Sequence, residues 1–550
     1  MISPRTKTLL VLLFVSVAVS AQKLKKADKL TLANLKTHVA FLADDKLEGR
    51  RAGTNGEKLA MEYIKGQFET IGLLPKGTDG FYQAFEINEG KQIGPGTYLK
   101  INNASLEAGK DFFPFPFSFN KKIDATPAIA IQEADMPWFV DLAETLEENK
   151  SNPHFDLNEY IRNNSKKAAD RGATAVILFN SSATDDKLVF NGKDKSDPVS
   201  IPVIYVSKDA ANKYFKDKTA TVDIKLKTEI GEKKRTGHNV AGYIDNGAAS
   251  TVILGAHFDH LGYGEDGNSM MRTGEKLIHN GADDNASGSA ALIELARILK
   301  GSKTKTSNYL FVAFSGEELG LFGSKYYADN PTIDLKSVNY MLNMDMVGRL
   351  NDSTKVLSVG GYGTSPTWAS VVTTEDKKLP FVVKTDSSGS GPSDHTSFYR
   401  KDIPVLFFFT GQHRDYHRPS DDADKINYMG ELNVVNYIYS IINTLNKENQ
   451  KLAFLKTREP QMGTRAFSVT MGIMPDYTFS GTGVRADGVT EGRPAFKAGL
   501  KAGDIIIQIG EYSISSVETY MQTLGKFKKG DKTKVKFKRG NETIEAPVEF

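Results

Sequence analysis

Two adjacent glutamates, Glu317 and Glu318, follow an apolar run in the segment NYLFVAFSGEELGLFGSKYY (308–327). Like charges repel, and burying a carboxylate without a partner of opposite charge costs free energy. We therefore expect a positive partner beside this pair. Because the chain contains no cysteine, any metal site must be built from His, Asp and Glu side chains.

More acids and histidines stand where other predicted strands end. They are His257 and Asp259 in ILGAHFDHLG, Asp283 and Asp284 in HNGADDNASGSA, Asp345 in YMLNMDMVG, and Tyr416 and His417 in RDYHRPSDDADKI. One acid at a strand end is usually a cap or turn residue, but capping does not explain so many in one block. Carboxylates and imidazoles without thiolates suit two zinc ions that share a carboxylate. Metal is then the expected partner of the two glutamates.

The block that must position these residues, 238–448, alternates apolar strands with helices. This alternation predicts an α/β fold, a three-layer sandwich whose central, mostly parallel sheet is covered on both faces. Ligands of such sheets bind beyond the carboxyl ends of the strands. These acids and histidines are therefore expected at one edge of the sheet.

The remaining chain divides into further parts. Amphipathic helices are predicted in LTLANLKTHVAFLADD and in TNGEKLAMEYIKGQFETIGL, where Gly72 marks a helix end. We expect residues 22–105 to be the N-terminal part of the catalytic domain, 106–230 a β-rich insert, 231–450 the main catalytic domain and 460–550 a small β-rich module.

The first residues, MISPRTKTLLVLLFVSVAVSAQK, have a basic start, an apolar run and small residues at a cleavage position. This pattern predicts a signal peptide over 1–21 and export to the periplasm or the medium. The run is shorter than the roughly 20 apolar residues of a spanning helix, so no membrane anchor is expected. The net charge of +3 gives no reason to expect a nucleic-acid partner.

The segments GAHFDHLG, GADDNASGSA, SGEELGLFGS, NMDMVG and YHRPSDD, in this order, resemble the M28 family of co-catalytic zinc peptidases, mostly aminopeptidases. EYIRNNSKKAADRGATAVILFN with IPVIYVS is similar to a protease-associated domain. GRPAFKAGLKAGDIIIQIG is similar to a PDZ domain, a small β-barrel or sandwich. The resemblance implies a secreted metallo-aminopeptidase with a zinc-exopeptidase fold, acting on peptides.

The resemblance also implies residue roles. One zinc ion would be held by His257 and Asp345 and the other by Glu318 and His417, with Asp284 bridging both. Glu317 would act as general base toward a water activated by the two zinc ions.

The other site residues have supporting roles in this interpretation. Tyr416 would donate to the oxyanion, and Asp259 would fix the imidazole of His257. Asp283 is expected to be a neighbouring turn residue, and Asp394 and His395 of GPSDHTSF are expected to shape the pocket.

Several alternatives stay open. A carboxypeptidase or glutaminyl cyclase could use the same scaffold, and a carboxypeptidase would need an arginine such as Arg349, Arg414 or Arg418. The chain could also be an inactive peptide-binding protein, although intact acids at every metal position argue against this. Manganese or cobalt could replace zinc.

In the last module, Gly472 and Ile473 are the candidates for receiving a peptide C-terminus, as PDZ-like domains do by strand addition.

Overall fold

The computed structural model describes residues 24–150, 152, 155–194, 196–271, 273–372, 379–448, 450–457, 469–475, 482–515, 517–540 and 542–550. The predicted signal peptide lies outside these residues. The described chain forms two compact units, of which one is Ala84–Gly237 and the other contains the residues before and after it. Among the described residues, no helix is both long and apolar enough to cross a membrane.

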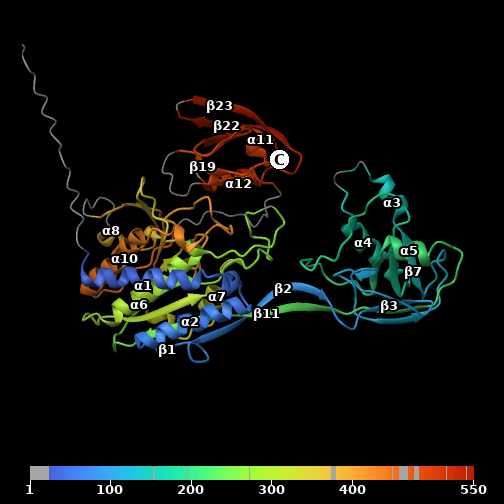
Figure 1. Cartoon of the computed structure of the whole chain (residues 1–550). Coiled ribbons are helices and arrows are strands. Elements are labelled where there is room, and N and C mark those ends of the chain that lie inside the picture. The colour runs from blue at the N-terminus through green and yellow to red at the C-terminus, as the bar shows by residue number, and fades with distance from the viewer. Residues whose placement is uncertain are drawn as a thin grey trace, which may run out of the picture. The chain divides into compact units, whose positions relative to one another are not determined.

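The unit that contains the residues before Ala84 and after Gly237 is the first unit, and a mixed sheet of nine strands is its centre (Figure 1). Its order is β1-β11-β13-β12-β14-β17-β15-β16, and β2 also pairs with β11. Its strands are β1 (Leu74–Pro75), β2 (Tyr82–Ile93), β11 (Ile230–Ile244), β12 (Thr251–His257), β13 (Asn308–Phe314), β14 (Val338–Met344), β15 (Val356–Gly360), β16 (Val382–Thr385) and β17 (Val405–Phe409). The neighbours β13, β12, β14 and β17 are parallel, so their carboxyl ends share one edge.

Alternating side chains of these strands build one core on each face of the sheet. In β12, Val252 and Leu254 belong to a core shared with α1 (Lys26–Leu42), α2 (Asn55–Ile71), α6 (Gly288–Lys300) and α10 (Tyr428–Glu448). Ile253 points into the opposite core, which includes residues of α7 (Phe322–Asp329) and α9 (His395–Tyr399). The predicted three-layer α/β sandwich is therefore confirmed.

The two predicted N-terminal helices are α1 and α2, and α2 ends at Gly72, whose φ of 82° is the left-handed conformation expected of a helix-ending glycine. The elements that were not predicted include the strands β15 and β16 and the short helix α8 (Trp368–Val371) between them.

The second unit, Ala84–Gly237, starts earlier and ends later than the predicted insert, 106–230. It has two four-stranded sheets, β4-β3-β10-β6 and β5-β9-β8-β7. Its strands are β3 (Tyr98–Ile101), β4 (Ala104–Leu106), β5 (Phe112–Pro114), β6 (Lys122–Ala125), β7 (Pro137–Asp141), β8 (Ala175–Phe179), β9 (Val203–Val206) and β10 (Ile224–Lys227), and its helices are α3 (Ala143–Glu148), α4 (Leu157–Asp170) and α5 (Lys208–Tyr214). Its identity as a protease-associated domain stays a prediction.

The C-terminal module has its own antiparallel sheet, in the order β18-β19-β20-β22-β23, and its own hydrophobic core. Its elements are β18 (Ile473–Pro475), β19 (Val484–Val489), α11 (Pro494–Lys497), β20 (Ile505–Ile509), β21 (Tyr512–Ser513), α12 (Val517–Leu524), β22 (Lys532–Arg539) and β23 (Glu542–Glu549).

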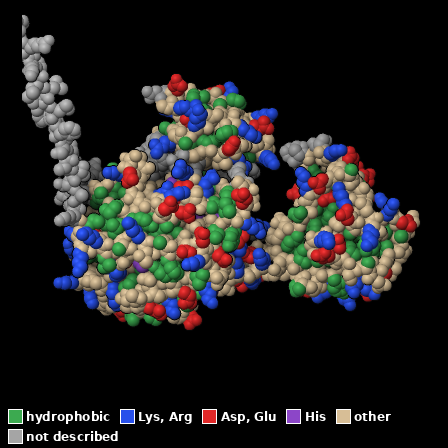
Figure 2. Space-filling view, viewed as in Figure 1, with side chains coloured by type: hydrophobic (Ala, Val, Ile, Leu, Met, Phe, Trp, Pro, Cys, Tyr) green, Lys and Arg blue, Asp and Glu red, His purple; other side chains and the backbone are tan. Residues whose placement is uncertain are grey.

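On the face of the molecule shown in Figure 2, basic and acidic side chains intermingle, as the small net charge predicts.

Candidate metal centre

The predicted acids and histidines meet at the carboxyl edge of the parallel strands. His257 is the last residue of β12, Asp345 follows β14, and Glu317 and Glu318 follow β13. Two loops complete the cluster, with Asp284 in the turn before α6 and His417 beyond β17. Strand order therefore brings three of the five segments together, and the two loops bring the other two to the same edge.

The first group of possible ligands surrounds Nε2 of His257. This nitrogen lies 3.4 Å from Oδ1 of Asp284 and 3.3 Å from Oδ1 of Asp345. These distances exceed the ordinary N–H···O length of about 2.9 Å. Two ligand atoms on one tetrahedral zinc ion, each about 2.0 Å from it, stand about 3.3 Å apart. The spacing of this group therefore fits a metal ion.

The second group surrounds Nε2 of His417, which lies 3.3 Å from Oδ2 of Asp284 and 3.1 Å from Oε2 of Glu318. Asp284 thus presents one oxygen to each group, which is the arrangement of a bridging carboxylate. The donor set fits a pair of zinc ions, with His257 and Asp345 in one group, His417 and Glu318 in the other, and Asp284 shared.

The outer nitrogens of both histidines face oxygen atoms. Nδ1 of His257 lies 3.2 Å from the backbone oxygen of Asp259 and 3.6 Å from its Oδ1. Nδ1 of His417 lies 2.9 Å from the backbone oxygen of Asn268. An oxygen at Nδ1 favours a proton there, so Nε2 of each ring is left to bind metal.

The two adjacent glutamates differ electrostatically. Burial raises the pKa of Glu317 well above its usual range, although the nearby His257 opposes this. Burial would raise the pKa of Glu318 as well, but His417 and His260 hold this pKa well below its usual value. Glu318 is therefore the carboxylate kept ionised as a ligand, and Glu317 is the one suited to carry a proton.

Tyr416 lies flat against His417, with ring centroids 3.8 Å apart and planes 20° apart. Burial raises the pKa of Tyr416 well above 10, and the carboxylates of Asp284 and Glu318 add to the effect. Its hydroxyl therefore keeps its proton at neutral pH and can donate a hydrogen bond near the cluster.

Asp283 turns away from both groups. Its Oδ1 accepts hydrogen bonds from the backbone N–H of Gly348, at 2.7 Å, and from Oγ of Ser287, at 3.0 Å. Its Oδ2 faces Nε2 of His413 at 3.2 Å. These contacts fix the loop after β14, and they give Asp283 the structural part expected of a turn neighbour.

Asp394 and His395 are both buried at the start of α9. Burial raises the pKa of Asp394 to about 7, with opposition from the charge of His257. The ring of His395 stacks on Phe407, with centroids 4.5 Å apart, and burial lowers its pKa to about 3. His395 is thus a neutral packed ring rather than a ligand.

Sequence reasoning missed His260, which stands with Asp284 and Glu318 in a further set of possible ligands. Its Nδ1 lies 2.7 Å from Oε1 of Glu318 but 4.0 Å from Oδ2 of Asp284. The first distance is that of a hydrogen bond and the second is too long for a shared ion. The signal was present in AHFDH, where His260 follows His257 at the same strand end.

Sequence reasoning also missed Arg50, which is 1% exposed. Its guanidinium donates to the backbone oxygen of Phe258 at 2.7 Å and of Gly281 at 2.9 Å, and also to those of Leu42 and Asn280. Burial lowers its pKa to about 10 against the opposing charges of nearby carboxylates. Arg50 therefore ties together the end of α1, the residue after β12 and the turn that precedes Asp284.

The arginines that a carboxypeptidase could use differ in availability. Nη2 of Arg349 lies 3.3 Å from Oδ2 of Asp415, so its charge is already paired. The side chain of Arg414 is 90% exposed. Nε of Arg418 is buried without a hydrogen-bond partner among the described residues.

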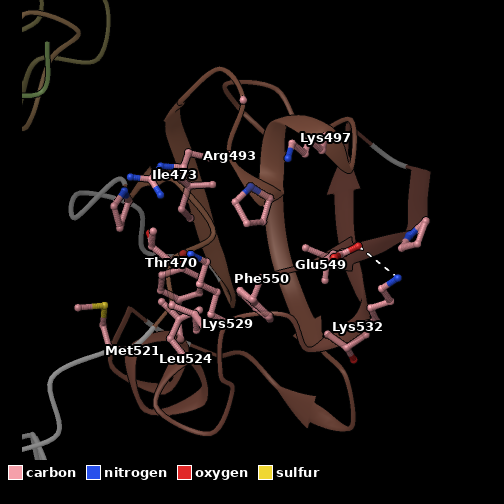
Figure 3. Close-up of a pocket in the computed structure, with 18 residues that line it drawn as sticks. Thr470, Ile473, Arg493, Lys497, Met521, Leu524, Lys529, Lys532, Glu549 and Phe550 are labelled. Carbon is pink, nitrogen blue, oxygen red and sulfur yellow. Dashed lines mark ion pairs between the residues drawn. The ribbon is translucent and has the colours of Figure 1, made fainter. Parts of the chain in front are cut away.

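A groove of about 1030 Å³ lies in the C-terminal module and is lined by residues of β18, α11, α12, β22 and β23 (Figure 3). Ile473 lines it together with Met521 and Leu524, and the basic side chains around it are Arg493, Lys497, Lys529 and Lys532. The predicted Gly472 is not among the lining residues. Its N–H donates to Oγ1 of Thr470, and the side chain of Arg493 packs against it. The structure thus brings Ile473 but not Gly472 to this groove.

Two family models match the chain. Residues 239–442 match the model of peptidase family M28, and residues 460–550 match that of the PDZ domain. The sheet and the two ligand groups define a candidate metallohydrolase centre. The chain accordingly contains a domain of peptidase family M28, residues 239–442, followed by a PDZ domain, residues 460–550.

Among its relatives is the aminopeptidase YwaD of Bacillus subtilis, 28% identical over 280 residues, 49% of this chain and 56% of that protein. An aminopeptidase of Pseudomonas aeruginosa is 30% identical over 190 residues, 34% of this chain and 32% of that protein. The chain thus spans less than two thirds of these relatives. A solved zinc aminopeptidase of Bacillus subtilis is 21% identical, with a TM-score of 0.42 over 77% of this chain and 98% of that one.

Proposed function

We propose that the protein is an exported metallo-aminopeptidase that holds two zinc ions and releases N-terminal residues from peptides. The observation that carries this proposal is the pair of ligand groups that share Asp284, with a carboxylate oxygen of Glu317 3.9 Å from Nε2 of His257. The M28 domain and the relatives named as aminopeptidases support the reaction class. The predicted signal peptide supports export.

When bound, two zinc ions supply Lewis acidity that lowers the pKa of water and polarises a carbonyl group. His257, Asp345, Asp284, Glu318 and His417 would hold them. Zinc is favoured by a donor set of imidazoles and carboxylates at these spacings.

The chain's own groups supply the proton transfers. Glu317 would take the proton of the attacking water on its carboxylate and return it to the leaving amine. Its raised pKa brings this exchange closer to neutral pH. The hydroxyl of Tyr416 would donate a hydrogen bond to the oxyanion that develops on the scissile carbonyl.

In the PDZ domain, we propose that a peptide adds along β18 and places an apolar side chain against Ile473 and Leu524 (Figure 3). The lining also contains one acidic side chain, Glu549, whose Oε2 lies 3.5 Å from Nζ of Lys532. The three further basic side chains Arg493, Lys497 and Lys529 leave a positive excess that makes a terminal carboxylate a favourable ligand. Fluorescence titration of the full chain with labelled peptides, carboxylate or C-terminal amide, tests this. Equal affinity for both forms would contradict it.

Hydrolysis of one set of short peptides, each with a free or an acetylated N-terminus, tests the catalytic proposal. We expect the purified chain to release N-terminal residues from the free peptides only, and to lose this activity on chelation and in Glu317→Gln. Release of C-terminal residues from both forms would instead identify a carboxypeptidase. Cyclisation of N-terminal glutamine without hydrolysis would identify a cyclase.

A further inference from the structure

His260 and Asn268 are not among the predicted ligands. They contact two members of the second group, Glu318 and His417. Nδ1 of His260 lies 2.7 Å from Oε1 of Glu318, while Oε2 of the same glutamate lies 3.1 Å from Nε2 of His417. One oxygen of Glu318 is therefore engaged by an imidazole N–H, and only the other faces the ligand group.

The place of His260 is built into the fold. Its side chain is 0% exposed, and its ring stands edge-on to that of His417, with centroids 5.8 Å apart. Gly281 makes room for the ring, because a Cβ at this glycine would lie 2.5 Å from Cγ of His260. The φ of Gly281, +56°, also favours glycine.

Asn268 contacts the same two ligands through its side chain and its backbone. Its side-chain amide donates to the backbone oxygen of Glu318 at 2.6 Å, and its own backbone oxygen lies 2.9 Å from Nδ1 of His417. The backbone N–H of Met270 donates to the backbone oxygen of His417 at 2.9 Å. The segment 262–271 therefore lies along the second group.

This segment is anchored by an ion pair with two contacts. Nε of Arg51 lies 2.8 Å from Oδ2 of Asp266, and Nη2 lies 2.8 Å from Oδ1. A paired guanidinium and carboxylate fix both distance and orientation. Asn268, two residues on, is held at the ligands by this anchor.

We propose that His260 and Asn268 are positioning residues of the second metal site, an inference that rests on the proposed function. His260 holds Glu318 so that a single oxygen meets the metal, and Asn268 fixes the separation of Glu318 and His417. The distances at Nδ1 of His260 fit a hydrogen-bond donor, not a third ligand. Contacts of this kind typically change metal affinity by about 10- to 100-fold when removed.

Calorimetric zinc titration of the full chain, with bound zinc counted by atomic absorption, tests the proposal. The wild type is expected to bind two zinc ions, and His417→Ala should identify which binding event belongs to the second group. His260→Phe and Asn268→Ala should weaken that event by about 10- to 100-fold and leave the other unchanged.

His260→Asn is the matched control, because its amide N–H can stand where Nδ1 stood. We expect it to restore most of the affinity, whereas a ligand imidazole would not be replaced by an amide. His38→Asn controls for the loss of a buried imidazole ring. His38 belongs to α1 and is hydrogen-bonded to Tyr63, so this variant should leave both zinc-binding events unchanged.

The outcomes separate this inference from the proposed function. Two zinc ions bound with unchanged affinity in His260→Phe and Asn268→Ala would overturn the inference alone. A loss in His260→Asn as large as in His260→Phe would also overturn it, because His260 would then be a ligand. A wild type that binds no zinc would overturn the proposed function and the inference together.

Discussion

Oδ1 of Asp259 lies 3.6 Å from Nδ1 of His257 and accepts the backbone N–H of Glu317 at 3.1 Å. A single buried oxygen therefore faces the imidazole of the first ligand group and also holds the backbone of the expected general base. The ligand and the base are linked through one carboxylate, so a change at Asp259 should affect both.

Asp259→Asn tests this link. The substitution keeps the size of the side chain but removes the charge that favours the Nδ1 proton of His257. We expect zinc affinity at the first group to fall about 10- to 100-fold, measured by titration against a chelator of known affinity. Asp329→Asn, at an acid whose side chain is 66% exposed, is the control and should have no effect.

Glu317→Gln and Glu318→Gln should fail in different ways, because one glutamate transfers protons and the other binds metal. Glu317→Gln is expected to keep two zinc ions and lose about 10²- to 10⁴-fold in kcat. Glu318→Gln is expected to lose zinc as well. Metal content and kcat measured side by side separate these outcomes, and loss of zinc in Glu317→Gln would contradict the assigned roles.

Removal of zinc should destabilise the M28 domain, because the clustered and largely covered carboxylates Asp284, Asp345, Glu317 and Glu318 then repel one another. Zinc at 100 times its dissociation constant contributes about 2.7 kcal/mol per site. Calorimetry of the full chain with and without chelator should show one transition that moves with zinc. Equal movement of all transitions, or of none, would contradict this assignment.

Arg50→Lys should destabilise the same transition. Lysine cannot reproduce the fork of donors that reaches the carbonyls of Phe258 and Gly281, so buried oxygens lose their partners. We expect a loss of about 3 kcal/mol or more, as when a buried charged group loses its partners. Arg51→Lys, at the neighbouring and partly exposed arginine, should cost less, about 1 kcal/mol. Equal losses of unfolding free energy in the two variants would show that the buried contacts of Arg50 stabilise the fold no more than the partly exposed contacts of Arg51.

The neutral ring of His395 makes stability depend on pH. Burial lowers its pKa to about 3 in the folded state, whereas the unfolded pKa is about 6.5. Between these values the unfolded chain binds a proton that the folded chain does not, so stability falls as pH falls below 6.5.

His395→Phe keeps the stack on Phe407 and removes this proton. As pH falls from 7.5 to 4.5, the free energy of unfolding of the zinc-free variant should rise relative to that of the zinc-free wild type by on the order of 2 kcal/mol. Denaturant unfolding at each pH measures the difference. Parallel curves for the two proteins would show that His395 titrates normally in the folded state.

The sequence was sufficient to predict the ligand edge, because parallel strands place their carboxyl ends together whatever the detailed packing. His257, Asp284, Glu318, Asp345 and His417 each stand at such an end or in a loop beyond it, and they meet in space. The helices α1 and α2 were predicted for a similar local reason, the period of their apolar residues and Gly72.

Other features depend on contacts between distant segments, which no local pattern encodes. Arg50 lies 208 residues before the carbonyl of Phe258 to which it donates, and Asn268 lies 149 residues before His417. The strands β15 and β16 are short and join the sheet only through pairing with each other and with β17. Their pairing with β17, rather than any buried apolar run in β16, makes them strands of this sheet.

The chain leaves the central sheet for the second unit and returns from it at neighbouring positions. The chain departs after Gln83 and returns at His238, and there Nδ2 of Asn239 donates to Oε1 of Gln83 at 3.0 Å. Exit and return thus lie side by side on the paired strands β2 and β11 (Figure 1). The parallel strands β13, β12, β14 and β17 all lie outside Ala84–Gly237. A short turn in place of these residues would shorten β2 and β11 but leave the metal edge intact, so during evolution this module could be gained, lost or exchanged without a change at that edge.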